Sequence, residues 1–536
     1  MSIAIVGMAG AVKALDAHQL DPSIGVDSVN QRPRFGEMVP WRQPLTVASV
    51  PAGRKTIYRM GRDVVSDANY WFSWTTIVHA VRGFLASDTT ERTYFTGSGS
   101  PKVTDNIIGL AGAPYPTSAR ELGVPAPSGA STITQATAGT GTARLTFYAD
   151  TFITDKGEES KPRLIGSITT APGAIVDITS LPPVPAGNYG VTTRRLYRSE
   201  VGTSGQGEFF FLRDVPSGDA SVQDDARALG AGTMVTTGWE MPPADMHSLV
   251  GLWGGMMAGI SGRSIRFCEP YKPYAWPLSY EIVPPDVTPV GQAVWAKNLV
   301  VLTNGRPLLV NGSTPSAMGD EPIEFDQACV SVQSIVASES GVIWASPDGL
   351  AYYGTAGPKI LTDGIVTREQ WQALAPETMV GTLFDGLYLG FYQVGGVWKG
   401  FAISATAPAG IYFLETGYPA AYLDKLREAV YVLDGGTSVK KWDAGAAFMT
   451  AKFVSKTFKL AHRVSMCALE VVARVWPVTV QLFADGEARG SRTVTSSEPV
   501  TIKGGAPARE WHAEITSAGV VLGVNIAPSI RDLRDE

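Results

Sequence analysis

The sequence is poor in the residues that carry chemistry. It has only three cysteines in 536 residues, and they lie too far apart for a metal-binding pattern or a disulfide framework. We expect Cys268, Cys329 and Cys467 to be reduced thiols in the protein interior. The five histidines, at positions 18, 79, 247, 462 and 512, are equally scattered. The composition therefore predicts neither a cofactor nor a metal site.

Familiar enzyme signatures are also missing. The sequence contains no G-x-x-x-x-G-K-[ST], no H-E-x-x-H and no G-x-S-x-G. Residues 346–349, Ser-Pro-Asp-Gly, resemble the Asp-box turn of sialidases, but the following residues do not continue that motif. We interpret Asp348 as a turn former. A propeller hydrolase, which needs paired carboxylates, is the least favoured function, and the protein is expected not to be an enzyme.

Charge is sparse and slightly acidic. Only 18% of the residues are charged, the net charge is −6 and the isoelectric point is near 5.6. Such a chain neutralises few phosphates, so tight nucleic-acid binding is not expected. No apolar run is long enough to span a bilayer. The apolar residues 1–12 have no preceding basic residues, so they predict an edge strand or an arm docked on a neighbour; a non-standard export signal is the alternative.

What the sequence does contain is a series of hairpins. Short apolar runs within 249–443 flank the turn pairs Asn304–Gly305, Asp348–Gly349, Asp385–Gly386 and Asp434–Gly435. Counted over Gly262, Gly305, Gly349, Gly386 and Gly436, successive turn glycines are 37–50 residues apart, close to the period of a β-propeller blade. A large β-sandwich made of hairpins is the alternative. The 44% apolar content is ample for packed cores.

The organisation predicted is all-β: an irregular β-propeller with an inserted fibronectin III-like sandwich and a C-terminal β-sandwich. We place an N-terminal propeller part at 1–125, the inserted sandwich at 126–236, the main blades at 237–450 and the C-terminal sandwich at 451–536. Linkers rich in Pro, Gly, Ser and Thr mark the start of the insert. Strands before residue 116 are expected to close the ring with residues near 450.

Two local signals predict helical turns. Thr367 and Gln370 have capping-box spacing at the start of a helix over 368–374. Ser118 and Glu121 have the same spacing within 117–122.

The aromatic loop 268–277 predicts a contact surface. It holds Tyr271, Tyr274 and Trp276 among three prolines, and Tyr and Trp are common interface anchors. A loop packed over a blade of its own chain is the alternative.

Several segments, taken in their order along the chain, resemble the tail nozzle proteins of short-tailed bacteriophages, the tail tubular protein B group. They cover most of the sequence and are 30–42 with Gly36 and Pro40, 92–97 to 102–105, 269–271 to 275–277, 344–349 and 477–480 to 484–486.

The resemblance implies a homo-oligomer, a ring of six copies that forms the distal part of a phage tail tube. Such a ring would lie in the virion tail, below a tail adaptor protein and beside tail fibres or spikes, and DNA would pass through its lumen. An acidic chain suits a conduit that must not retain DNA. The alternative from another class is a receptor- or glycan-binding propeller adhesin of a virion. The sequence identifies no pore-lining residues.

Overall fold

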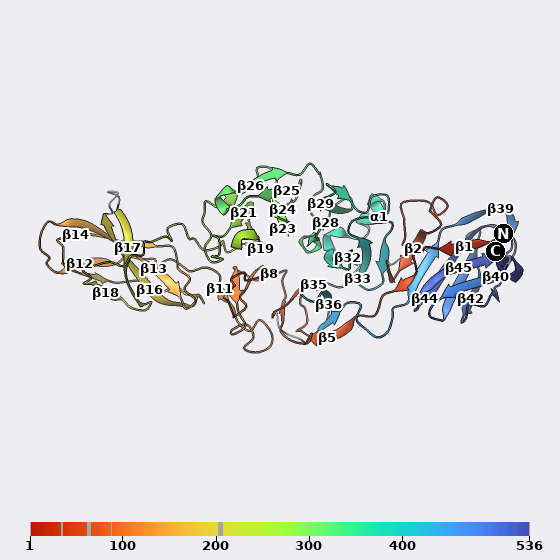
Figure 1. The fold of residues 1–536 in the computed structure, drawn as a ribbon, viewed down its shortest axis with the longest axis horizontal. Coiled ribbons are helices and arrows are strands. Elements are labelled where there is room, and N and C mark those ends of the chain that lie inside the picture. The colour runs from red at the N-terminus through yellow and green to blue at the C-terminus, as the bar shows by residue number, and fades with distance from the viewer. Residues whose placement is uncertain (1, 34–35, 62–65, 87, 202–206, 535–536) are drawn as a thin grey trace.

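The computed structural model describes residues 2–33, 36–61, 66–86, 88–201 and 207–534. Three bodies follow one another along the long axis of the molecule (Figure 1): a small sandwich, a ring of sheets and a second sandwich that holds both chain ends. Strands dominate, and the described residues form only two short α-helices, α1 (Arg368–Gln372) and α2 (Ile530–Arg534). The predicted fold class is confirmed: the chain is all-β and is built around an irregular β-propeller.

In the described part of the chain, seven antiparallel sheets make up the ring. At six junctions the innermost strands of neighbouring sheets pack together, and at the seventh an apolar cluster that includes Phe72, Trp74 and Phe95 joins the two sheets. Six sheets contribute four strands each, and one has two. The four-stranded sheets are β8 (His79–Arg82), β9 (Thr93–Thr96), β10 (Lys102–Thr104) and β11 (Arg120–Glu121); β19 (His247–Gly251), β20 (Met257–Ser261), β21 (Ser264–Phe267) and β22 (Glu281–Ile282); β23 (Pro289–Trp295), β24 (Asn298–Thr303), β25 (Leu308–Asn311) and β26 (Gly319–Pro322); β27 (Val336–Ala337), β28 (Gly341–Ala345), β29 (Leu350–Gly354) and β30 (Lys359–Ile360); β31 (Val380–Phe384), β32 (Leu387–Val394), β33 (Val397–Ser404) and β34 (Tyr412–Leu414); and β35 (Ala420–Asp424), β36 (Ala429–Leu433), β37 (Ser438–Lys441) and β5 (Leu45–Ser49). The two-stranded sheet is β6 (Thr56–Arg59) with β7 (Trp71–Trp74).

The ring is closed by an N-terminal strand, as the sequence predicts. Strand β5 pairs antiparallel with β37 and so completes the last sheet. Residues distant in sequence are thereby hydrogen-bonded, and the first and last parts of the ring hold each other in place. Large side chains fill the space between sheets; Trp71, for example, meets Tyr431 with ring centroids 4.8 Å apart.

The predicted turns lie between paired strands, but not all of them have the positive φ angles of a type I′ turn. Asp385 and Gly386 both have positive φ, 52° and 74°, as a type I′ turn requires. Asn304 has no positive φ; its side-chain oxygen instead accepts a hydrogen bond from the Thr288 amide at 2.8 Å. The turn thus ties two segments together, a role that a two-residue pattern cannot reveal.

One predicted helical turn is confirmed and the other is wrong. Thr367 and Gln370 form the full capping box at the start of α1. Residues 120–121 instead form strand β11, which pairs with β10 at the edge of a sheet. The sheet edge offers the backbone better hydrogen bonds than one isolated helical turn, which is costly to nucleate.

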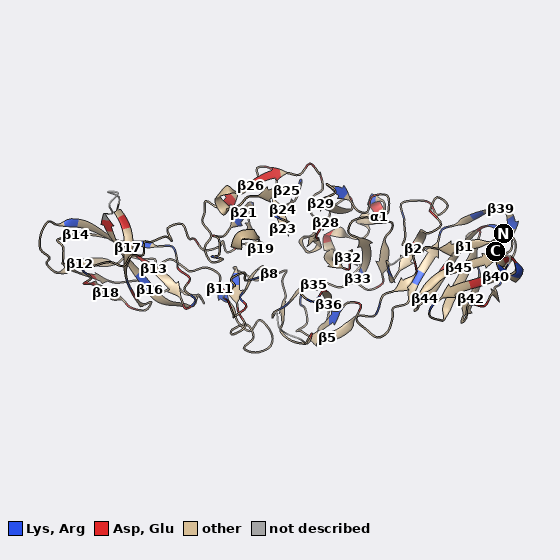
Figure 2. Cartoon of the chain, in the orientation of Figure 1, with Lys and Arg blue, Asp and Glu red and all other residues tan. Residues whose placement is uncertain are grey.

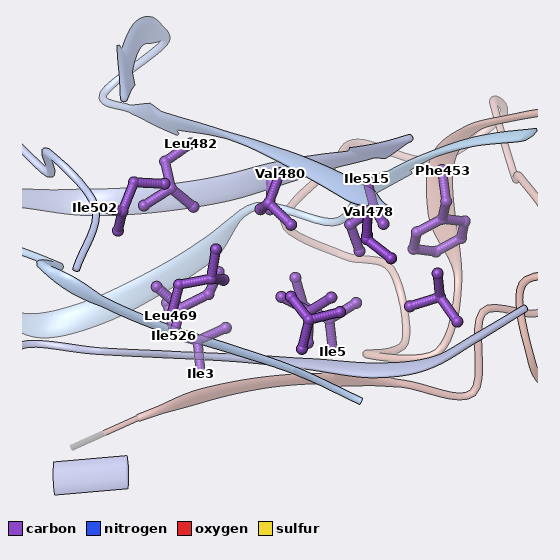
Figure 3. Close-up of a cluster of buried hydrophobic side chains, with 14 of the residues drawn as sticks. Ile3, Ile5, Phe453, Leu469, Val478, Val480, Leu482, Ile502, Ile515 and Ile526 are labelled. Carbon is purple, nitrogen blue, oxygen red and sulfur yellow. The ribbon is translucent and has the colours of Figure 1, made fainter. Parts of the chain in front are cut away.

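The terminal sandwich consists of two facing sheets around an apolar core (Figure 3), which contains Ile5, Phe453, Leu469 and Ile515. One sheet has the order β1 (Ile3–Val6), β45 (Val521–Ala527), β40 (Ala468–Ala473) and β43 (Val500–Thr501). The other contains β2 (Gly25–Val29), β38 (Ala451–Ser455), β44 (Ala508–Ser517), β41 (Val478–Ala484) and β42 (Glu487–Val494), with β39 (Phe458–Val464) paired to β44.

The N-terminal residues lie in this sandwich and not in the ring. Strand β1 is an edge strand that pairs with β45 of the same chain, which corresponds to the first of the two expectations for residues 1–12. Strand β2 also belongs to the sandwich. The structure therefore differs from the expected propeller segment 1–125, because β1 and β2 each join one of the two sheets of the terminal sandwich.

The inserted sandwich has a three-stranded and a four-stranded sheet, and all their strands fall within 126–236. The orders are β12 (Thr132–Thr137), β15 (Ile175–Thr179) and β18 (Ser221–Asp224), and β14 (Arg163–Thr170), β13 (Arg144–Thr154), β16 (Val191–Val201) and β17 (Gly207–Pro216). Gly123 lies against Met241 and Pro242, so the chain enters and leaves this body at one place.

Candidate functional site

Most of the aromatic side chains in the loop predicted as a contact surface pack against other residues of the same chain. Trp276 is 2% exposed and packs in the core between β8–β11 and β19–β22, with its Nε1 donating to the Pro273 oxygen at 2.7 Å. Tyr274 packs edge-on against Trp239, with ring centroids 5.8 Å apart. Burial raises the pKa of Tyr274. Trp276 is therefore not accessible to a partner, which corrects its expected role as an interface anchor.

Tyr271 is the member of the trio that stays on the surface. Its side chain is 59% exposed, and its ring meets Phe84 edge-on at 6.1 Å. The positive φ of 61° and the hydrogen bond from its amide to the Gly255 oxygen at 2.7 Å fix its place within the loop. A partner surface around Tyr271 remains a prediction.

Two histidines that looked isolated in the sequence come from adjacent innermost strands, His79 on β8 and His247 on β19. Burial, with a smaller repulsion from His247, lowers the pKa of His79 to about 4. Burial also lowers the pKa of His247, against an opposing effect of Asp245. His79 Nδ1 is buried without a hydrogen-bond partner. The pair is therefore neutral near pH 7 and forms part of a seam between two sheets.

Neither the cysteines nor the charged residues form a recognisable metal site in the described part of the chain. Cys268 and Cys329 are buried free thiols, as predicted, and burial raises the pKa of each to about 12; Cys467 is only half-buried. The described residues hold no group of three or more His, Cys, Asp or Glu side chains placed to bind a metal ion. Figure 2 shows basic and acidic residues interspersed along all three bodies. Neither helix in the described part of the chain approaches the length needed to cross a membrane.

Two shallow hollows differ in how their polar groups are used. The first, of about 350 Å³, lies on the inserted sandwich and includes Glu159, Arg195 and Tyr197. There the Tyr197 hydroxyl donates to Glu159 at 2.6 Å, and Arg195 forms two bonds to Asp214 at 2.8 and 2.9 Å. These groups satisfy one another, so the first hollow offers little to a ligand.

The second hollow, of about 290 Å³, lies on the ring between β7 and the sheet β8–β11. Among the described residues, its lining includes the cations Arg54 and Lys102 and no carboxylate. Nothing in the sequence pattern pointed to it, because its residues come from four separate segments. Only the folded ring brings them together.

Comparisons with known proteins add little to this description. No family model and no curated protein matches the chain. Among solved structures, it is similar to the Neurospora crassa Pan2 WD40 domain (8% identity, 51% of this chain and 86% of that chain, TM-score 0.27) and to the WD40 domain of Toxoplasma gondii coronin (12%, 60% and 88%, 0.24). It is also similar to PorZ of Porphyromonas gingivalis (10%, 87% and 77%, 0.26). With TM-scores this low, the fold rests on the strand pairing described above.

Proposed function

We propose that this protein is a structural subunit of a bacteriophage tail and forms, with further copies of itself, the distal tube through which DNA leaves. The observation that carries the proposal is the arrangement of three bodies in a row (Figure 1). A ring with one sandwich at each end offers separate surfaces for lateral neighbours and for the components above and below. The family resemblance of the sequence supports the same reading.

In this proposal the conduit lies between subunits and not inside the propeller. Turn η3 (Val332–Ser334) leads into β27, and Lys55 precedes β6, three sheets further round the ring. The Gln333 side chain nevertheless donates to the Lys55 oxygen at 3.4 Å. The opening of the ring is thus bridged at this level, which leaves no passage for a duplex. A tube for DNA therefore requires several copies around a common axis.

The mass of the purified full chain across a concentration series tests the proposal. We expect closed rings, six copies by the family resemblance, either alone or after addition of a tail adaptor protein. A chain that stays monomeric with both, and that gives a clear hit on a glycan array, would favour the adhesin. Hydrolysis of a host polysaccharide that is lost on substitution of one carboxylate would favour an enzyme.

A further inference from the structure

The second hollow exists because one sheet of the ring is incomplete. Within the described residues, the sheet β6–β7 has two strands, whereas the other six sheets contribute four each. Where a third strand would lie, the loop 113–117 meets β7 through a single bridge, and the Ser73 amide donates to the Tyr115 oxygen at 3.1 Å. The loop covers only part of β7 and leaves a recess against the neighbouring sheet.

The recess carries an uncompensated positive charge. Lys102 is paired with Glu121, Nζ to Oε1, at 2.7 Å. Arg54 has no carboxylate within ion-pair distance among the described residues, and its Nε is buried without a hydrogen-bond partner. A guanidinium is always charged and presents donors in a fork that matches one carboxylate. Of the two cations in the recess, Arg54 is thus the one available to pair with the negative charge of a ligand.

The recess also contains an unused hydroxyl. Ser73 is 5% exposed, and its Oγ has no hydrogen-bond partner. Buried polar groups are nearly always paired, and each exception calls for an explanation. Ser73 lines the recess together with Trp74, Tyr115 and Pro116, whose side chains give it flat apolar walls. An occupant that supplies a hydroxyl to Ser73 would satisfy this group.

We propose that this recess binds one sugar residue that carries a carboxylate. The carboxylate pairs with Arg54, a ring hydroxyl meets Ser73 and the apolar face of the sugar lies against the aromatic wall. The volume of about 290 Å³ is at the lower end for small-molecule sites, about 300 Å³, and suits a single ring. One unpaired cation matches a singly charged carboxylate better than a doubly charged phosphate. The proposal does not depend on the tail assignment.

Calorimetric titration of the purified full chain with glucuronate, glucose and inorganic phosphate tests this proposal. We expect saturable binding of glucuronate at up to about 10 mM and at least tenfold weaker binding of glucose. Arg54→Gln should weaken glucuronate binding roughly 10- to 100-fold, the range for a hydrogen-bonded charge. Arg227→Gln makes the same change at an exposed arginine of the inserted sandwich and should leave binding unchanged.

Ser73→Ala separates binding from folding. Because the hydroxyl has no hydrogen-bond partner among the residues that the structure describes, its removal should leave the melting temperature unchanged or raise it, while glucuronate binding weakens several-fold. Absence of glucuronate binding, equal binding of glucose, tighter Arg54-dependent binding of phosphate, or a Ser73→Ala variant that melts lower and binds normally would each overturn the assignment.

Discussion

The ring is joined to its two sandwiches in different ways. Towards the terminal sandwich, β34 of the ring pairs in parallel with β2, and β2 pairs with β38, so that one ten-stranded sheet runs through both bodies. Asn30, 4% exposed, donates from its side chain to Glu415 at 3.0 Å and to the Thr450 oxygen at 3.1 Å. This joint is a continuous, buried hydrogen-bonded structure.

Towards the inserted sandwich, the joint consists mainly of ion pairs, with a few hydrogen bonds such as that from the Glu121 amide to the Asn188 oxygen at 2.9 Å. Arg92 meets Glu158 at 3.0 Å, Lys156 lies 3.6 Å from Asp105, and Arg120 pairs with Asp155. Lys156–Asp105 and Arg120–Asp155 each have a partly exposed member and contribute little each, whereas Arg92–Glu158 is largely shielded from water. From this contrast we expect the ring and the terminal sandwich to fold as one unit and the insert to be separable.

The largest expected difference in folding is between deletion of the N-terminal strands and deletion of the inserted sandwich. Removal of residues 2–29 takes away β1 and β2, so we expect an aggregated or unfolded product, seen by circular dichroism and gel filtration. Replacement of 126–236 by a short flexible linker should leave the ring and the terminal sandwich folded, because Gly123 and Pro242 are already in contact. Aggregation of this second variant would show that the insert is part of the core.

A matched pair of asparagine variants compares the two joints directly. Asn30→Ala should lower the free energy of unfolding by about 3 kcal/mol, because three side-chain hydrogen bonds are lost at a buried site with φ of 54°, two donated by Asn30 and one accepted from the Glu415 amide at 3.2 Å. Asn188→Ala removes an exposed bond to the Ala119 oxygen at 3.1 Å and should cost only about 0.5 kcal/mol. Urea unfolding followed by tryptophan fluorescence gives both values, and equal losses would remove the distinction.

The seam between β8 and β19, the two sheets that flank the insert, should be sensitive to acid. The pKa of His79 is about 4 in the folded chain, below its ordinary value of 6.5, so the unfolded chain takes up the proton first. Stability is then fully present above pH 6.5 and is lost as the pH falls towards 4, by about 2 kcal/mol at pH 5.

The matching variant is His79→Gln, measured by urea unfolding at pH 7.5 and pH 5. Its absolute stability can differ from that of the parent chain, but the difference between the two pH values should shrink. His462→Gln, at an exposed histidine of β39 in the terminal sandwich, serves as the control. A pH dependence that persists unchanged in His79→Gln would contradict the claim that protonation of His79 causes the loss of stability in acid.

The smallest effect concerns salt. Raising the ionic strength from about 0.05 to 0.5 M shortens the screening length and weakens partly exposed pairs, by less than about 1 kcal/mol each. We expect the inserted sandwich to become more mobile relative to the ring in small-angle scattering, while the terminal sandwich keeps its place. The double variant Arg120→Asp with Asp155→Arg keeps the pair and should respond like the parent chain.

The sequence predicted what depends on local pattern, namely the strands, their turns and the capping box of α1. The closing of the ring also followed from the position of the N-terminal strands. The participation of residues 3–6 and 25–29 in the terminal sandwich did not, because strand pairing over more than 400 residues leaves no mark on either strand alone. Trp276 was misread for a related reason, since an aromatic anchor and a core aromatic have the same composition and differ only in burial.

The recess at Arg54 could not have been predicted either. Its polar groups are ordinary surface residue types in the sequence, and they become unusual only when the fold buries them without partners. Strands and their turns are thus readable from periodicity, whereas an unsatisfied buried group is a property of the three-dimensional surroundings.

The proposed function rests on assembly, and electron cryo-microscopy of the purified chain, alone and with a tail adaptor protein, tests it most directly. The proposal predicts closed rings of copies around an axial channel wide enough for a DNA duplex, with the propeller openings lying away from that channel. Single dispersed molecules under both conditions, or rings without an axial opening, would contradict it.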